Sequence, residues 1–220
     1  MKKLHLLLLL FFIGCSKASS QSDQVRYHDD GLAKPKVAVI KVIDTSTHNL
    51  AWDLSTEFTE ILLEQLFSRS KFYITDDFQM ITSAQLKKLE LSPFSEDMSW
   101  LLEMNNSSEF VLFTEVLDHK IETQNQITYN PLTHLKTLHL SVRVCVLDIR
   151  KSVPKVVLQE IITKEYTIAF NFGSYSEEGS VISKSTFALS PLGLAHKNIV
   201  SEMTKEVEDY ILIAQSNVYD

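Results

Sequence analysis

The side chains with the greatest capacity for chemistry are scattered along this sequence. It contains seven histidines and two cysteines, and no group of them has the spacing typical of a metal site. His134 and His139 are five residues apart in a segment that we predict to be extended, so their side chains should point to opposite faces of a strand. We therefore expect no metal site and no cofactor.

Acid–base and nucleophilic chemistry is also weakly supported. The adjacent carboxylate pairs fall in a predicted tether or in predicted loops, where they are expected to be solvated turn residues rather than general acids and bases. These pairs are Asp29-Asp30, Asp76-Asp77 and Glu177-Glu178. Cys145 lies in the middle of a predicted strand and is expected to be a half-buried, inert thiol. The loop 173–177 does not match a nucleophile elbow, and the five glycines form no phosphate-binding loop. We expect no catalytic residues and no enzymatic activity.

The N-terminus has the pattern of a secretory signal. Lys2 and Lys3 precede the apolar run Leu4–Ile13, which is shorter than the roughly 20 residues that a spanning helix needs. The alternatives are a short membrane anchor or a buried helix. The run ends in Phe12-Ile13-Gly14-Cys15, which resembles the lipobox of bacterial lipoprotein precursors. We therefore predict a signal peptide over 1–14 and lipidation of Cys15.

Lipidation would determine both the location and the redox chemistry of the chain. Several acyl chains anchor a protein stably, since each buried methylene contributes about 0.8 kcal/mol. Ser16 follows the cysteine, where a residue other than Asp resembles the default signal for the outer membrane. We expect an exported protein, lipid-anchored to a bacterial membrane and facing the periplasm from the outer membrane. Cys145 would then have no disulfide partner, and the fold would depend on packing alone.

Length and charge limit the remaining possibilities. The chain has 220 residues, which suits one domain with extensions. It has 21 basic and 28 acidic side chains, a formal net charge of −7. An acidic surface argues against nucleic acid and anionic headgroups as principal partners.

The hydrophobic patterns predict a flexible polar tether over 15–34 and a single domain over 35–220. Strands are predicted at 36–43, 72–75 and 110–117, a long hairpin with arms near 138–146 and 156–172, and helices from about 54, at 81–89, at 97–104 and from Ser190-Pro191. The first arm of the hairpin has a strict period of two, with one face packed and the other largely wet. Its apolar positions are Leu138, Leu140, Val142, Val144 and Val146, and they alternate with His139, Ser141, Arg143 and Cys145. This order predicts an α/β two-layer sandwich, a mixed β-sheet with a long antiparallel hairpin and helices mainly on one face.

The pattern over residues 36–170 resembles a known family. The strand Lys36–Val42 fits K-x-A-V-x-x-h, and a helix, the strand 72–75 and the segment 100–116 follow in the same order. This arrangement is similar to the periplasmic α/β domain of the penicillin-binding-protein activator lipoproteins and the curli-secretion channel lipoproteins. One difference is Asn106–Glu109, where that family has Gly-Ala-Asp. The resemblance implies an adaptor or activator that binds other envelope proteins, such as the cell-wall synthesis machinery.

Two alternatives remain open. The lipoprotein that plugs the outer-membrane lipopolysaccharide translocon has nearly the same order of elements, although the segment 81–105 favours the first family. Both families act by binding proteins. The third possibility is a periplasmic enzyme of unknown class.

Overall fold

The computed structural model describes residues 24–47, 50, 52–75, 94, 98, 100–101, 107–123, 133–171 and 187–216. The predicted signal peptide and Cys15 lie outside these residues, as does the predicted helix at 81–89. Of the predicted helix at 97–104, only Met98, Trp100 and Leu101 are described.

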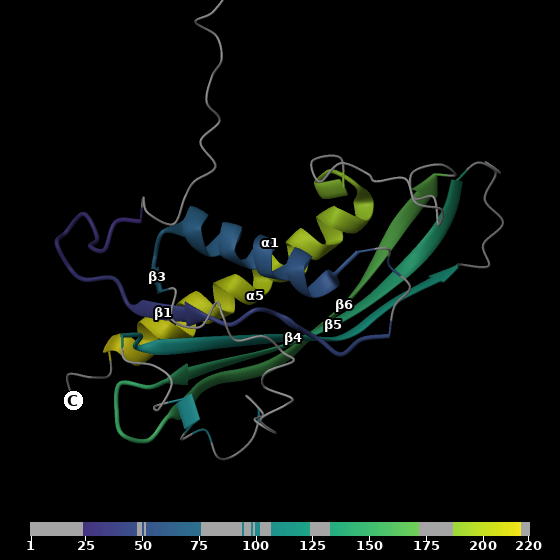
Figure 1. Ribbon diagram of the computed structural model, residues 1–220. Coiled ribbons are helices and arrows are strands. Elements are labelled where there is room, and N and C mark those ends of the chain that lie inside the picture. The colour runs from purple at the N-terminus through teal and green to yellow at the C-terminus, as the bar shows by residue number, and fades with distance from the viewer. Residues whose placement is uncertain are drawn as a thin grey trace, which may run out of the picture.

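Within the described residues, six strands form one mixed sheet (Figure 1). The strands are β1 Lys36–Val39, β2 Ile43–Asp44, β3 Tyr73–Thr75, β4 Phe110–Thr123, β5 Thr133–Asp148 and β6 Lys155–Asn171, and the helices are α1 Leu54–Arg69 and α5 Pro191–Ser216. The sheet order is β3-β1-β4-β5-β6, and β2 also pairs with β4. The pairs among β1, β2, β3 and β4 are parallel, whereas β4, β5 and β6 are antiparallel neighbours. The predicted mixed sheet and α/β class are confirmed.

Both long helices start where the sequence predicts. Asp53 caps α1, because its side chain accepts a hydrogen bond from the backbone N–H of Ser55. At the start of α5, the hydroxyl of Ser190 accepts the N–H of Gly193 at 3.0 Å, and Pro191 occupies the first helical position.

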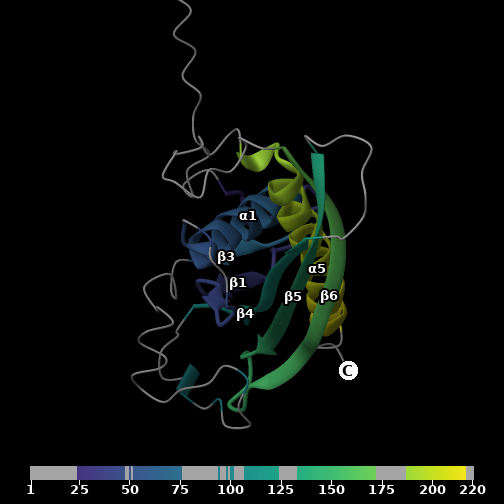
Figure 2. The same cartoon turned by 90° about the vertical axis from the view of Figure 1, so that its right-hand side faces the viewer.

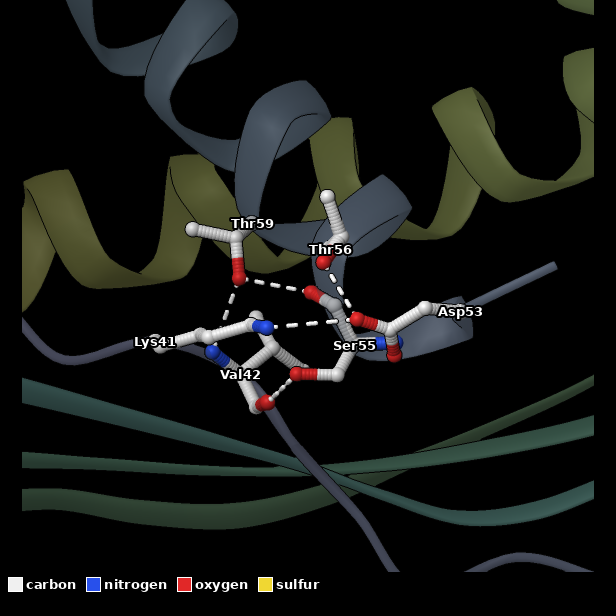
Figure 3. Close-up of polar contacts among 6 residues, drawn as sticks. All are labelled: Lys41, Val42, Asp53, Ser55, Thr56 and Thr59. Atoms are coloured by element: carbon white, nitrogen blue, oxygen red, sulfur yellow. Dashed lines mark hydrogen bonds and ion pairs between the residues drawn. The ribbon is translucent and has the colours of Figure 1, made fainter. Parts of the chain in front are cut away.

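The predicted strand 36–43 is broken into β1 and β2. Between them the pairing with β4 changes by one residue, since Val39 is opposite Leu112 whereas Ile43 is opposite Glu115. One extra residue therefore bulges out of the ladder. Hydroxyl groups of α1 satisfy the backbone there: the N–H of Val42 donates to Thr59 Oγ1 at 2.9 Å, and its carbonyl accepts from Ser55 Oγ (Figure 3).

Two apolar clusters lie on opposite faces of the sheet. Figures 1 and 2 show α1 and α5 on the same face of the sheet. In the first cluster, their buried side chains pack against alternate residues of the strands. All five apolar positions of the first hairpin arm, Leu138, Leu140, Val142, Val144 and Val146, are buried there. This part of the prediction is confirmed. The placement of all helices mainly on one face stays a prediction, because the segment 81–89 is not among the described residues.

The second cluster corrects the prediction for Cys145. Ala38, Ile40, Val111, Phe113, Cys145 and Leu147 are buried on the other face, together with Met98 and Leu101, and Phe94 and Trp100 pack against them. Cys145 is fully buried, not half-buried. The prediction was wrong because alternation along one strand cannot show that residues distant in sequence cover its second face.

The folded contacts begin before Pro35. Tyr27 forms an antiparallel bridge with Ala33, and Gly31 adopts a positive φ of 82° in the turn between them. The side-chain amide of Gln24 also bonds both backbone groups of Ile74, at 2.8 Å to its nitrogen and 3.3 Å to its oxygen. We call residues 24–34 the N-terminal hairpin.

Candidate functional site

A chain of hydrogen-bonded polar side chains joins α1, α5 and β4, and its two histidines are buried. Nε2 of His119 lies 2.9 Å from Nε2 of His196, and Nδ1 of His196 lies 2.6 Å from Oε1 of Glu57. The indole N–H of Trp52 donates to the second oxygen of Glu57 at 2.6 Å. The whole path therefore runs from the edge of α1 into the core.

Local structure explains how the side chains of Glu57, His196 and His119 come together. Glu57 lies in the first turn of α1, where its backbone N–H bonds the carbonyl of the cap residue Asp53 at 3.2 Å. His196 lies on the buried face of α5. In β4 the register shifts between Val116 and Asp118, so that His119, rather than Asp118, faces the helices opposite the buried Leu140.

The geometry restricts the protons. A bond between two Nε2 atoms requires one of them to donate and the other to accept. A bond from Nδ1 of His196 to a carboxylate places a proton on Nδ1. Either His119 donates to a neutral His196, or a doubly protonated His196 donates to both neighbours and forms an ion pair with Glu57. In both states the buried polar groups have hydrogen-bond partners, as folded interiors require.

Burial makes acid–base catalysis at these imidazoles an unsuitable role. His196 is 0% and His119 is 2% exposed. The rings of Phe58 and Phe187 lie 5.0 and 6.0 Å from that of His196. A general base must come within hydrogen-bond reach of its substrate, and both rings lie almost entirely out of contact with solvent. The arrangement suits a structural role, in which it fixes α5 on α1 and β4.

Within the described ranges, no group of three or more His, Cys, Asp or Glu is arranged to hold a metal ion. None of the helices in the described part of the chain is long and apolar enough to cross a bilayer.

A second polar cluster lies on the other face of the sheet. Arg143 of β5 donates from Nε to Glu115 of β4 at 2.9 Å, and Thr45 donates to the same carboxylate at 2.9 Å. The guanidinium lies 3.8 Å above the ring centre of Phe94, an arrangement favourable for a cation and an aromatic face. The contact with Arg143 holds Phe94 against this face of the sheet. Beside it, burial raises the pKa of the Cys145 thiol to about 11, although the charge of Arg143 opposes the shift.

The structure separates the other candidate residues. Asp29 and Asp30 are exposed turn residues, and Asp30 accepts the N–H of Leu32 at 2.9 Å. His139 lies on the outer face of the sheet, 3.0 Å from Glu165 and 3.6 Å from Glu122. The acidic pairs Asp76-Asp77 and Glu177-Glu178, the loop 173–177, and the side chain of His134 lie outside the described residues.

Sequence reasoning missed the pairing of His119 with His196. One signal was available: His196 lies four residues after Leu192 and three before Ile199, within the apolar stripe of the last helix. A histidine in such a stripe is buried, and a buried imidazole needs a partner. The sequence does not show that the partner would come from β4.

The two edges of the sheet differ. At one edge, Tyr73 of β3 donates its N–H to Pro35 beside β1 at 2.9 Å. The backbone N–H and C=O groups of adjacent strand residues point to opposite sides of the strand. Those of Ile74 therefore point away from β1, and Gln24 bonds both of them. The other edge is β6, which has 17 residues. Among the described residues, no strand pairs with its outer side.

The described residues form an α/β unit in which a polar network joins both helices to the sheet. The match to a family model over residues 23–215 shows that the chain belongs to DUF7499, a family of unknown function. No curated protein matches the sequence.

Among solved structures, the chain is similar to the hypothetical protein CT253 from Chlamydia trachomatis. The two are 27% identical with a TM-score of 0.62, over 81% of this chain and 98% of that one. Other matching structures include bacterial lipoproteins. Lipoprotein GNA1162 from Neisseria meningitidis has 14% identity and a TM-score of 0.37, over 78% of this chain and 99% of that chain. Rare lipoprotein B from Shewanella oneidensis has 7% identity and a TM-score of 0.30, over 83% and 99%. Both TM-scores are below 0.5, so these two likenesses are weak.

Proposed function

We propose that this chain is a lipid-anchored protein of the bacterial envelope that binds another envelope protein along the outer edge of β6. It acts by binding rather than by turnover, as an adaptor or activator. The observation that carries the binding role is the position and length of β6.

The edge of β6 has the properties of a surface that accepts a strand. Sheet edges are commonly protected by short strands, proline or bulges. β6 instead runs for 17 residues without a proline, and its one register shift against β5 lies near its start, between Val156 and Leu158. Its exposed side chains include Val156 and Ile161, which are 44% and 55% exposed. Lys164, the kind of residue that protects an edge, lies 2.8 Å from Glu202 of α5. An extended peptide that adds to such an edge gains backbone hydrogen bonds along its length.

The anchor is supported by the sequence of residues 1–15. A basic start, a short apolar run and Gly14 before Cys15 are the features of a lipoprotein precursor. Cys15 is the proposed site of the lipid, and the outer membrane, facing the periplasm, is the proposed location. Support for binding over turnover comes from the burial of His119 and His196 away from solvent.

Metabolic labelling with a palmitate analogue tests the anchor. We expect the wild-type chain to incorporate the label and Cys15→Ala to lose it and leave the membrane fraction. Equal labelling of the two would show that Cys15 is not the lipidation site.

Photo-crosslinking in intact cells tests the edge. A photoreactive residue at Ile161 should capture one discrete partner, whereas the same residue at Leu194 of α5, which is 46% exposed, should not. Thr163→Pro and Lys164→Pro refine the test, because the N–H groups of neighbouring residues point to opposite sides of the strand.

One of the two prolines removes a hydrogen bond to β5 and should lower the melting temperature. The other replaces an outward N–H and should leave the melting temperature unchanged but abolish crosslinking. If the well-folded proline variant kept full crosslinking, strand addition at β6 would be wrong.

A further inference from the structure

The N-terminal hairpin carries three large apolar side chains that the fold leaves in solvent. Val25, Tyr27 and Leu32 are 63%, 52% and 66% exposed. Exposed apolar groups that lie close together mark a surface that another phase or molecule covers. The antiparallel bridge between Tyr27 and Ala33 and the bond from His28 N to Leu32 O at 2.8 Å hold these three residues within one small ordered unit.

This unit is fixed to the domain. Gln24 bonds the backbone of Ile74 in β3, and Lys34 at the other end donates from Nζ to Ser70 Oγ at 2.8 Å. Lys34 is also buried, at 6% exposed. The hairpin therefore moves with the sheet, and any surface that holds the hairpin also orients β3 and β1.

The distance to the proposed anchor is short. Gln24 follows Cys15 by nine residues, and a chain of nine residues spans at most roughly 30 Å. A lipid on Cys15 would thus keep the hairpin within that distance of the bilayer surface. Leu189, which is 78% exposed, lies beside the start of α5, and Figure 1 shows this part of the molecule well away from the purple hairpin.

We propose that the N-terminal hairpin lies in the interface of the bilayer that holds the anchor, with Val25, Tyr27 and Leu32 inserted among the headgroups and upper acyl chains. The proposal rests on the lipid anchor proposed above. Tyrosine suits this position because its ring is apolar and its hydroxyl is polar. Valine and leucine gain by leaving water.

Charge indicates that the contact is apolar and shallow. The exposed charges of the hairpin are Arg26, Asp29 and Asp30, a net charge of −1. This sum gives no attraction to anionic lipid, in agreement with the acidic composition of the whole chain. The two carboxylates at the turn stay hydrated at the level of the headgroups, because an unpaired charge is costly in hydrocarbon.

The test uses the intact protein, purified with its lipid and reconstituted into phosphatidylcholine vesicles. An environment-sensitive fluorophore is attached to Leu32→Cys, to Val25→Cys as a second position, and to Leu189→Cys as the matched control. Each labelled protein is measured in two vesicle samples, one of which contains a phospholipid with a quencher on its acyl chain. Intact-mass measurement reports the acyl groups on each sample before reconstitution.

We expect quenching several-fold stronger at Leu32 and Val25 than at Leu189, and the same in vesicles with added anionic lipid. An acylated protein whose hairpin labels are not quenched, or are quenched no more than Leu189, would overturn the proposal and leave the anchor intact. A blue-shifted emission without quenching would indicate that a second copy of the chain covers the hairpin, which also overturns it. A protein without acyl mass would instead contradict the lipid anchor.

Discussion

The two halves of the β4–β5 pair differ in how they are covered. In one half, which we call the covered half, residues 110–116 of β4 are all buried, as are most of residues 142–147 of β5. Helices pack on one face there, and the side chains of Phe94, Met98, Trp100 and Leu101 pack on the other. In the other half, which we call the open half, residues 117–122 of β4 and 138–141 of β5 alternate in exposure, and the buried positions are on the helix side.

The difference shows how one strand can be covered on both faces along one part of its length and on a single face along the rest. Phe110–Val116 reads as a continuous, mostly apolar run, as strands covered on both faces do. Beyond it, Asp118, Lys120 and Glu122 fall on the wet face, with Lys120 and Glu122 2.5 Å apart. The bulge between Val116 and Asp118 lies at the boundary. The bulge thus marks the point where the covering of the second face ends.

The largest expected loss of stability comes from a charge placed on the buried face of β5. Val144→Asp places an unpaired carboxylate at a fully buried position of the covered half, and Val142→Asp does the same beside it. Burial of such a charge costs several kcal/mol, which rivals the total stability of a domain. Urea unfolding should show both variants to be largely unfolded.

Ser141→Asp is the control for this pair of variants. Ser141 bonds Thr163 at 2.7 Å on the exposed face of the open half, so the added charge stays solvated. We expect a change below about 0.5 kcal/mol. Similar unfolding midpoints for all three variants would mean that the faces are assigned wrongly.

The next effect concerns the buried polar chain. Glu57→Gln removes the charge that accepts from both His196 and Trp52, and it should destabilise the protein by about 1.5–3 kcal/mol. Glu64→Gln, on the exposed side of α1 and 3.9 Å from Lys197, should change stability by less than about 0.5 kcal/mol. Equal losses of stability in chemical denaturation would contradict a structural role for the network.

A smaller effect depends on pH. Burial alone would raise the pKa of Asp148, but the hydrogen bonds from Arg150 outweigh it and lower the pKa below the ordinary 3.8. A lowered folded pKa stabilises the protein above about pH 4, and this contribution is lost as the pH falls through the lower folded value. Asp148→Asn should therefore cost about 1 kcal/mol at pH 7 and little at pH 2.

The open half supplies the comparison for this titration. Lys120 lowers the pKa of Glu122 by a hydrogen bond, but Glu122 is exposed, so Glu122→Gln should leave the pH dependence of unfolding unchanged. The measurement is the urea midpoint between pH 2 and 7. A pH profile for Asp148→Asn identical to that of the wild type would refute the assignment.

The last prediction concerns the accessibility of the thiol, which changes the rate of its modification and not the stability of the protein. Cys145, with its pKa raised to about 11 and its side chain fully buried, should react with a thiol reagent at pH 8 on the order of 100-fold more slowly than an unperturbed thiol. A cysteine introduced as Ser141→Cys in the open half should react at an ordinary rate. Comparable rates at the two positions would show that the second face is not covered at Cys145.

Local patterns were sufficient for most of the fold. The period of two predicted the packed face from Leu138 to Val146, and the Ser190-Pro191 signal predicted where the last helix begins, because both depend on neighbours in sequence. The break after Val39 was missed, since its bulge is stabilised by Ser55 and Thr59 of the following helix. A pattern within the strand holds no information on those hydroxyl groups.

The candidate sites show the same limit. Lipidation of Cys15 could be predicted because its signal is contiguous, whereas the contact of His119 with His196 joins positions 77 residues apart. The bulge that turns His119 toward the helices has no marker such as glycine or proline in Val116–Asp118. Burial of Cys145 likewise depends on Phe94, Met98, Trp100 and Leu101, which are distant in sequence.

The clamp of Gln24 on Ile74 limits how many copies of this sheet could join. A sheet with two free edges can add a strand at each and extend without end, as fibrous aggregates do. Here one side chain occupies the outward backbone groups of Ile74 in β3, so that, of the two edge strands among the described residues, only β6 can accept a strand. Growth of the sheet by edge pairing would therefore stop after a single addition. Gln24→Ala, which removes the amide, would leave the edge at β3 free to pair as well.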